Sequence, residues 1–99
     1  METKIVRTQL LPAEEEAEAI ALKALTFLVR DGSRLNALQE ATGIDLATLR
    51  THMTERAVQV AVLDHLLSDE SLLLIFAQDE GLDPNLPRLA RIRLSGEDI

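Results

Sequence analysis

The sequence contains no cysteine, no tryptophan and no tyrosine, and its only aromatic residues are Phe27 and Phe76. Without cysteine the chain has no disulfide, no thiolate nucleophile and no cysteine ligand for zinc. Two phenylalanine side chains also leave few surfaces on which bases or sugars can stack. The composition therefore excludes disulfide scaffolds and thiol enzymes, and it argues against binding to single-stranded nucleic acid.

Positive charge is also scarce. Ten Lys and Arg residues stand against 17 Asp and Glu residues, which gives a formal net charge of -7 at pH 7. Because cationic contacts to phosphates supply much of the affinity for nucleic acids, we expect no nucleic-acid partner. The opening stretch METKIVRTQLL is too short and too polar for a secretory signal, so we expect a cytoplasmic protein.

Long uninterrupted apolar runs are missing too. The most apolar stretch, residues 57–76, contains three carboxylates and one histidine. A membrane-spanning helix needs about 20 predominantly apolar residues, and charged side chains inside the bilayer are costly. We therefore expect no membrane association and assign this stretch to the protein core.

The sequence does contain an internal similarity between its two halves. When residues 19–50 are laid over residues 57–88, nine of the 32 positions are identical. These identities are Ala19/Ala57, Leu25/Leu63, Leu28/Leu66, Asp31/Asp69, Ser33/Ser71, Leu35/Leu73, Gly43/Gly81, Asp45/Asp83 and Arg50/Arg88. The valines at positions 58, 60 and 62 alternate with other residues and favour a strand by themselves, but the first copy has a helical pattern. We interpret the similarity as a degenerate duplication with two helical copies.

Capping and breaking residues divide both copies into helices. Gly43 suits a left-handed helix end, and Asp45 is placed to accept hydrogen bonds from the first amides of the next helix. Pro87 has no amide proton and biases Leu86 toward an extended conformation, so the start of the last helix stays open. The expected helices cover residues 12–30, 34–41, 46–53, 54 or 55 to 67, 69–80 and a last segment reaching 94.

The predicted fold class is therefore all-α. We expect a compact five- to six-helix bundle built from two degenerate three-helix repeats, residues 19–50 and 57–88, with the two long helices at its centre. A single helical domain spans residues 12–94, followed by a frayed tail at 95–99. Residues 1–11 form a flexible or docked N-terminal arm, whose docking residues would be Ile5, Val6, Leu10 and Leu11.

Three segments carry a resemblance to a known family: AEAIALKALTFLVRDGSRL (17–35), ATGID (41–45) and VLDHLLSDESLLLIFAQDEGLDP (62–84). The Leu-Asp-x-Leu-Leu and Gly-Leu-Asp-Pro elements are the more specific parts. Together they resemble a bacterial family of small helical proteins described only as a domain of unknown function, from about Ala17 to Arg91. The resemblance implies an all-helical fold in a bacterial cytoplasm, and it carries over no catalytic or binding residue.

Residues Leu38 to Arg50, LQEATGIDLATLR, are similar to a helix-turn-helix with Gly43 in the turn. On this alternative the protein is a transcriptional regulator that reads DNA with residues 46–53. Against it, Gln39 stands where the tight helix crossing usually has a small residue, and Arg50 is the only cation of the segment. The DNA-binding residues of this alternative are Arg50, Thr51 and His52.

The two histidines, His52 and His65, are candidates for metal binding and for catalysis. His52 precedes Glu55 by three residues, a spacing found in helical di-metal sites, but those sites need the motif twice and two further glutamates. Asp64 and His65 resemble a general-base pair, yet no nucleophile and no glycine-rich phosphate loop accompanies them. We predict no catalytic residue, no cofactor and no metal site, and thus a protein that is not an enzyme.

The only predicted partner site comes from a difference between the two copies. Where the first copy has the polar residues Arg34 and Asn36, the second has leucines, so its short helix is apolar on nearly every side. Such a helix needs a cover, either from within the chain or from a protein partner or twin subunit. We therefore expect a non-enzymatic protein-protein interaction or regulatory module, with a partner surface at Leu72, Leu74 and Ile75.

Overall fold

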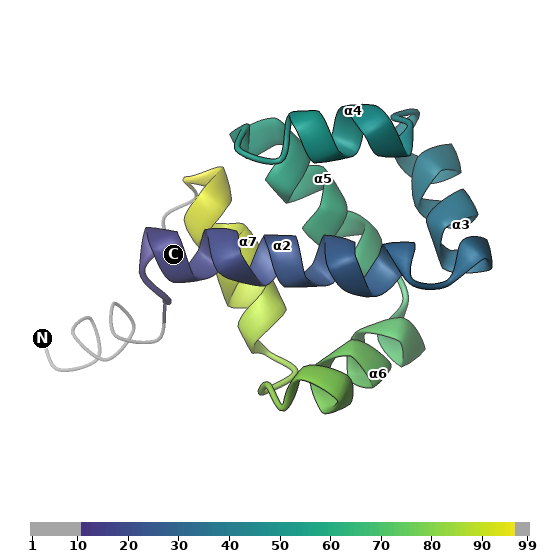
Figure 1. Cartoon of the computed structure of the whole chain (residues 1–99). Helices are drawn as coiled ribbons and strands as arrows, with labels where there is room; N and C mark the ends of the chain where they lie inside the picture. Colours follow the sequence, from purple (N-terminus) through teal and green to yellow (C-terminus); the bar gives the residue numbers. More distant parts are fainter. Residues whose placement is uncertain (1–10, 97–99) are drawn as a thin grey trace, which may run out of the picture.

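The computed structural model describes residues 11–96, and within that range every regular element is an α-helix (Figure 1). The structure confirms the predicted all-α fold class. Residues 1–10, with most of the expected N-terminal arm, and residues 97–99 lie outside the described residues. The helices are α2 (Glu14–Val29), α3 (Gly32–Thr42), α4 (Leu46–Thr51), α5 (Arg56–Leu67), α6 (Glu70–Glu80) and α7 (Leu86–Ser95).

Side-chain caps fix the start of three helices. Asp31 accepts hydrogen bonds from the amides of Ser33 and Arg34 at the start of α3, and Asp45 accepts one from Thr48 in α4, at 2.8 Å. Asp69 does the same for Leu72 in α6. Each carboxylate satisfies an amide that has no partner inside its helix, which is why these helices begin where they do.

The expected left-handed glycine at the end of α3 is confirmed, and α6 ends in the same way. Gly43 has φ 71° and Gly81 has φ 68°, a conformation that costs other residues energy but glycine almost none. The start of α7 is now defined as well. Pro87 is the second residue of α7, where no amide proton is required.

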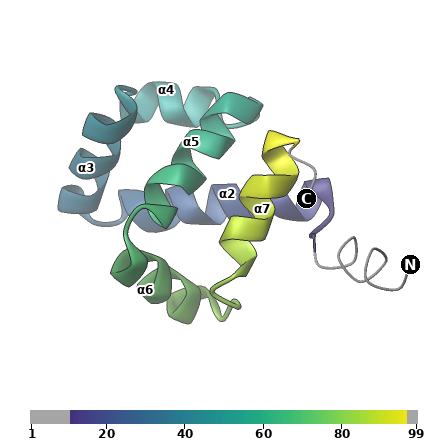
Figure 2. The ribbon, with the colours of Figure 1, turned by 180° about the vertical axis from the view of Figure 1, so that it is seen from behind.

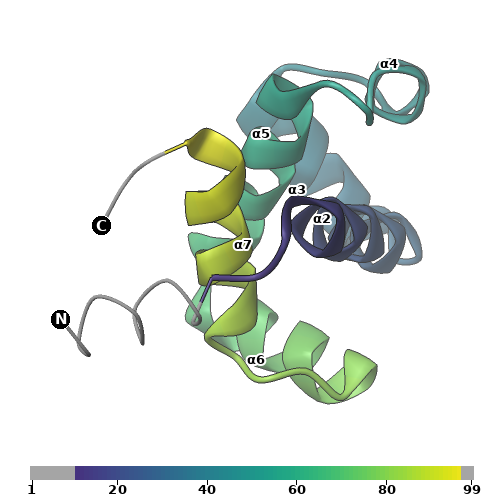
Figure 3. The same ribbon diagram turned by 90° about the vertical axis from the view of Figure 1, so that its left-hand side faces the viewer.

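The core is formed mainly by α2, α5 and α7, which all contact one another. Figure 2 shows α5 and α7 lying across the same face of α2. The smaller helices α4 and α6 lie on opposite sides of this group (Figure 3). The fully or almost fully buried apolar side chains include Ile20, Ala24, Leu28, Leu38, Leu49, Val62, Leu63, Leu66, Phe76, Ala90 and Leu94.

The structure does not confirm two equivalent three-helix repeats. When the two copies are aligned, the bounds of α3 coincide with those of α6, and the end of α2 coincides with the end of α5. The third helices depart from this pattern, because α7 packs against both α2 and α5 whereas α4 makes no extensive contact with either. The duplication therefore remains an interpretation of the sequence.

The third helix of the first half is shorter than predicted. It ends at Thr51, and Met53, which we expected inside it, lies in the turn before α5 and is buried in the core. His52 occupies the C-terminal cap position of α4.

Candidate functional site

The outer face of α6 carries two adjacent exposed apolar side chains. Leu74 is 47% exposed and Ile75 is 46% exposed, which places them among the three large hydrophobic residues most exposed in residues 11–96. Leu72, the third residue of the predicted partner site, differs. It is partly buried and packs against the core, so less of its side chain is open to a partner than in Leu74 and Ile75. The polar character of Arg34, its aligned residue in α3, did not determine how Leu72 is oriented, because the neighbours of α3 and α6 differ.

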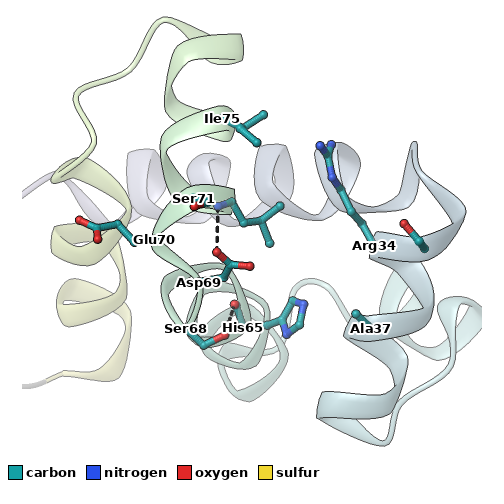
Figure 4. A pocket seen from close by; sticks show the side chains of 10 residues that line it. Arg34, Ala37, His65, Ser68, Asp69, Glu70, Ser71 and Ile75 are labelled. Atoms are coloured by element: carbon teal, nitrogen blue, oxygen red, sulfur yellow. Dashed lines mark hydrogen bonds between the residues drawn. The ribbon is translucent and has the colours of Figure 1, made fainter.

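An open groove of about 710 Å³ separates the first turns of α3 and α6. Figure 4 shows Arg34 and Ala37 on the α3 side and Ile75 on the α6 side, with His65 of α5 between the two helices. Leu72 also lines the groove. The exposed face of α6 therefore continues into a concave surface, since Ile75 belongs to both.

Aromatic contacts hold the two walls of the groove in place. The rings of Phe27 and Phe76 meet edge to face with centroids 5.4 Å apart, which connects α2 to α6. The guanidinium carbon of Arg34 lies 4.6 Å from the centroid of the Phe27 ring. This cation–π contact orients the Arg34 side chain along the α3 wall. Arg30, which follows α2, and Asp79 of α6 add an exposed ion pair at 3.5 Å.

The charges around the groove are mixed. Ser33 donates its side-chain hydroxyl to Asp31 at 2.7 Å, and this bond, with the amides of Arg34 and Ser33, holds the pKa of Asp31 below its ordinary value. Asp69 accepts a hydrogen bond from the amide of Leu72, and Glu70 points away from α3 (Figure 4). Cationic, anionic and apolar side chains all line the groove. It therefore suits a partner surface of mixed character better than one strongly charged ligand.

The residues of the DNA-binding alternative lie on and just after α4. Arg50, Thr51 and His52 are all exposed. Thr51 donates its hydroxyl to the carbonyl of Ala47 at 2.8 Å, and His52 Nδ1 lies 2.6 Å from Glu55 Oε2. Two of the three predicted side chains are thus engaged within their own helix or turn.

Gln39 has a structural role that the sequence analysis did not assign. Its Oε1 accepts a hydrogen bond from the amide of Leu46 at 2.9 Å, which connects α3 to the first residue of α4. Together with the Asp45 cap, this contact satisfies two amides at the start of a helix of only six residues. The signal in the sequence was a polar residue where a helix-turn-helix usually has a small one. Its side chain satisfies an amide at the start of the next helix.

Asp64, which precedes His65 in the pair considered as a general base, is bound by another helix. Asp64 Oδ1 accepts a hydrogen bond from Arg91 Nε at 2.6 Å, so its carboxylate is held by α7. Within residues 11–96 no three His, Asp or Glu side chains are grouped closely enough to hold a metal ion. In the same part of the chain no helix is both long and apolar enough to cross a membrane.

Sequence reasoning missed one unusual residue of α5. Gln59 is only 3% exposed, which makes it the one buried polar side chain of the core region in residues 11–96. Its Nε2 donates to the carbonyl of Met53 at 2.9 Å, and its Oε1 has no hydrogen-bond partner among the described residues. The available signal was the alternation of Gln59 with the valines around it, which bears on strand or helix but does not predict a buried amide.

The fold and these sites define a small all-helical protein with open surface grooves. The chain belongs to the family described as Protein of unknown function (DUF3572), whose family model matches residues 14–97, from the first residue of α2 to beyond α7. This match confirms the resemblance seen in the sequence. No curated protein and no solved structure matches the chain.

Proposed function

We propose that this chain is a non-enzymatic protein-protein interaction module whose partner covers the outer face of α6. The observation that supports the proposal is the adjacent pair Leu74 and Ile75, each about half exposed, beside the groove between α3 and α6. Single exposed hydrophobic residues are common on soluble proteins, but here two large exposed side chains occupy consecutive positions of one helix and one of them, Ile75, lines a groove. Exposed apolar surface beside a concavity is a feature of interaction sites. Covering the exposed half of each side chain contributes about 1 kcal/mol to association.

The corresponding part of α3 supports the same assignment. At the positions aligned with Leu74 and Ile75, α3 carries Asn36 and Ala37, and neither offers a large apolar surface. Ala37 nevertheless lines the same groove as Ile75. A partner that docks on α6 therefore meets the large apolar side chain of Ile75 on one side of the groove and the small side chain of Ala37 on the other, which gives the contact a direction. Asn36 does not line this groove.

The helix-turn-helix alternative remains a prediction, and no feature of α4 favours it. Arg50 is still the only cation between residues 46 and 51, and the carboxylates of Asp45 and Glu55 flank this segment. Phosphate contacts need a cationic surface. A regulatory role and a cytoplasmic location are likewise parts of the proposal that follow from the sequence alone.

The test replaces both exposed residues by glutamate, Leu74→Glu with Ile75→Glu. A matched control carries Asn36→Glu with Ala47→Glu, which adds the same charge at exposed positions of α3 and α4. Sedimentation velocity measures self-association, and cross-linking in the cells that express the chain measures contact with other proteins. Thermal melting monitors the fold of both variants.

We expect both variants to melt close to the unchanged protein, since the four substituted side chains are exposed. Association, whether with a twin subunit or with another protein, is lost in the α6 variant and kept in the control. An α6 variant that associates normally would refute the proposal. So would an α6 variant that unfolds, because the two side chains would then be covered from within the chain.

A further inference from the structure

A second open groove, of about 350 Å³, lies between α2 and the turn that connects α4 to α5. Four of its residues come from α2 with a spacing of three, four and seven positions, so they share one face of that helix. This groove is separate from the α6 surface and shares no residue with the groove beside it. Its lining residues are Glu15, Glu18, Ala19, Leu22, Met53, Thr54 and Gln59.

Gln59 supplies the most informative group of this groove. The hydrogen bond from its Nε2 to the carbonyl of Met53 fixes which end of the amide is the oxygen. That oxygen is buried and has no partner within residues 11–96. Buried acceptors are almost always hydrogen-bonded in folded proteins, so the unpaired Gln59 oxygen is a position that an additional donor can satisfy.

Leu22 supplies an apolar contact. It is 53% exposed, the highest value among the exposed large hydrophobic residues of the described chain. Met53 borders the same groove, and its flexible thioether can adapt to a side chain that enters. Together with Ala19 these residues form a small apolar surface next to the buried amide oxygen.

Carboxylates give the groove its charge. Arg56 forms ion pairs with Glu14 and, at 3.9 Å, with Glu18. Glu15, in contrast, forms no ion pair with any residue of 11–96 and stands at the edge of the groove. One cation shared between two of these carboxylates leaves the first turns of α2 with negative charge, which favours a cationic group at this edge.

We propose that this groove binds a basic amphipathic segment of a partner protein. An apolar side chain of that segment packs on Leu22 and Met53, and a Lys or Arg side chain meets Glu15. The flexible Met53 side chain moves aside as the segment enters, so that an N–H donor reaches the buried Gln59 oxygen. Two helical turns separate Glu15 from Leu22, an axial distance of about 10 Å. A helical partner therefore presents its cation and its apolar side chain about two turns apart.

The probe for this site is a fluorescein-labelled helical peptide with leucines on one face and lysines two turns away, tested against the full chain by fluorescence anisotropy. We expect binding that weakens at least about tenfold with Leu22→Ser and with Gln59→Met. Leu74→Ser, the matched change on α6, leaves the affinity within about twofold. A second peptide with glutamate in place of lysine does not bind.

A second measurement uses the unchanged protein and follows the NMR signals of the Gln59 side chain. In the unchanged protein, the side-chain amide resonances of Gln59 shift when the lysine peptide is added, because the oxygen gains a donor. Unshifted Gln59 resonances at saturation would overturn the proposal, as would equal binding of the glutamate peptide.

Other occupants of the groove give different results, and each would overturn the assignment to a partner segment. A dimer that Leu22→Ser dissociates would show that a second copy fills the groove. Removal of residues 1–10 that raises the peptide affinity about tenfold would show that this part of the same chain competes for it. Loss of the α6 interaction alone leaves this proposal standing, because the two surfaces share no residue.

Discussion

The helices α4 and α7 are each the third helix of one half of the chain, but they occupy different positions in the fold. α7 packs against both α2 and α5, whereas α4 lies at the edge and buries a single leucine, Leu49. In α7 the residues Pro87, Ala90 and Leu94 are all buried and are spaced as one face of a helix. A ten-residue helix with such a face can enter the core, and a six-residue helix without one cannot.

Hydrogen bonds at its C-terminal end also fasten α7 in place. Arg93 Nε donates to the carbonyl of Pro12 at 2.9 Å, which connects α7 to the segment before α2. Arg56 of α5 donates to the carbonyl of Leu94, also at 2.9 Å. Charged donors satisfy the last carbonyls of a helix and interact favourably with its dipole. The comparison teaches that matching local sequence gives matching caps and helix ends, while packing decides which helix completes the core.

The largest predicted loss of stability comes from truncating a core leucine, and it should be similar in the two halves of the chain. Leu28 and Leu66 occupy aligned positions in the two copies and are both fully buried, so Leu28→Ala and Leu66→Ala should each lower the free energy of unfolding by about 2 to 5 kcal/mol. Urea denaturation measures the change, and Leu22→Ala, at an exposed position, serves as the control. A loss below about 1 kcal/mol at both sites would mean that the core is assigned wrongly.

The next prediction is that enlarging an alanine destabilises the protein in α7 but not in α4. Ala90 is fully buried in α7, which packs against α2 and α5, so Ala90→Leu should overpack the core and destabilise it by about 1 to 3 kcal/mol. Ala47 of α4 is exposed, and Ala47→Leu should change stability by no more than about 0.5 kcal/mol. Equal losses in the same urea experiment would contradict the different placement of the two helices.

The glycine caps should again behave alike. Gly43→Ala and Gly81→Ala each force a side chain into a left-handed conformation, and we expect a similar loss of about 1 to 2 kcal/mol for both. Gly32 lies in the first turn of α3 without a positive φ, so Gly32→Ala should be neutral or slightly stabilising. Thermal melting of the three variants is sufficient. A cost at Gly32 as large as at Gly43 would rule out the conformational explanation.

The smallest effect concerns acid stability. Hydrogen bonds from the Ser33 hydroxyl and from the amides of Arg34 and Ser33 lower the pKa of Asp31 in the folded protein. A carboxyl with a lowered folded pKa stabilises the fold fully above its unfolded pKa of about 3.9 and loses that stabilisation as the pH falls through the folded value. Asp31→Asn keeps a capping side chain without this titration. Its melting temperature should therefore fall less between pH 5 and pH 3, and an identical fall would refute the assignment.

The sequence predicted those parts of the fold that depend on neighbouring residues. Asp45 as a cap and Gly43 as a left-handed end follow from local hydrogen bonding and backbone sterics, and both are confirmed. The position of α7 was not predictable, because it depends on contacts with residues far away in the sequence, such as the bond from Arg93 to Pro12.

The candidate sites also combine features that the sequence predicted with features that depend on tertiary packing. An unusually apolar α6 was visible in the sequence, but the partial burial of Leu72 was not, since it depends on how α6 lies against the core. The same holds for the buried oxygen of Gln59 and for the stacking of Arg34 on Phe27, which both need the tertiary arrangement. The pattern of residue types predicted that α6 carries an apolar surface. Packing against the core determines which of its side chains remain exposed.

The most direct test of the account compares α6 with α3 by one measurement. Photoreactive benzoylphenylalanine is introduced at Leu74 or at Asn36, two exposed positions that align in the two copies, and cross-linking is carried out in cells that express the chain. We predict a protein cross-linked to position 74 and none to position 36. Equal cross-linking from both positions, or none from position 74, would contradict the claim that α6 carries a partner surface that α3 lacks.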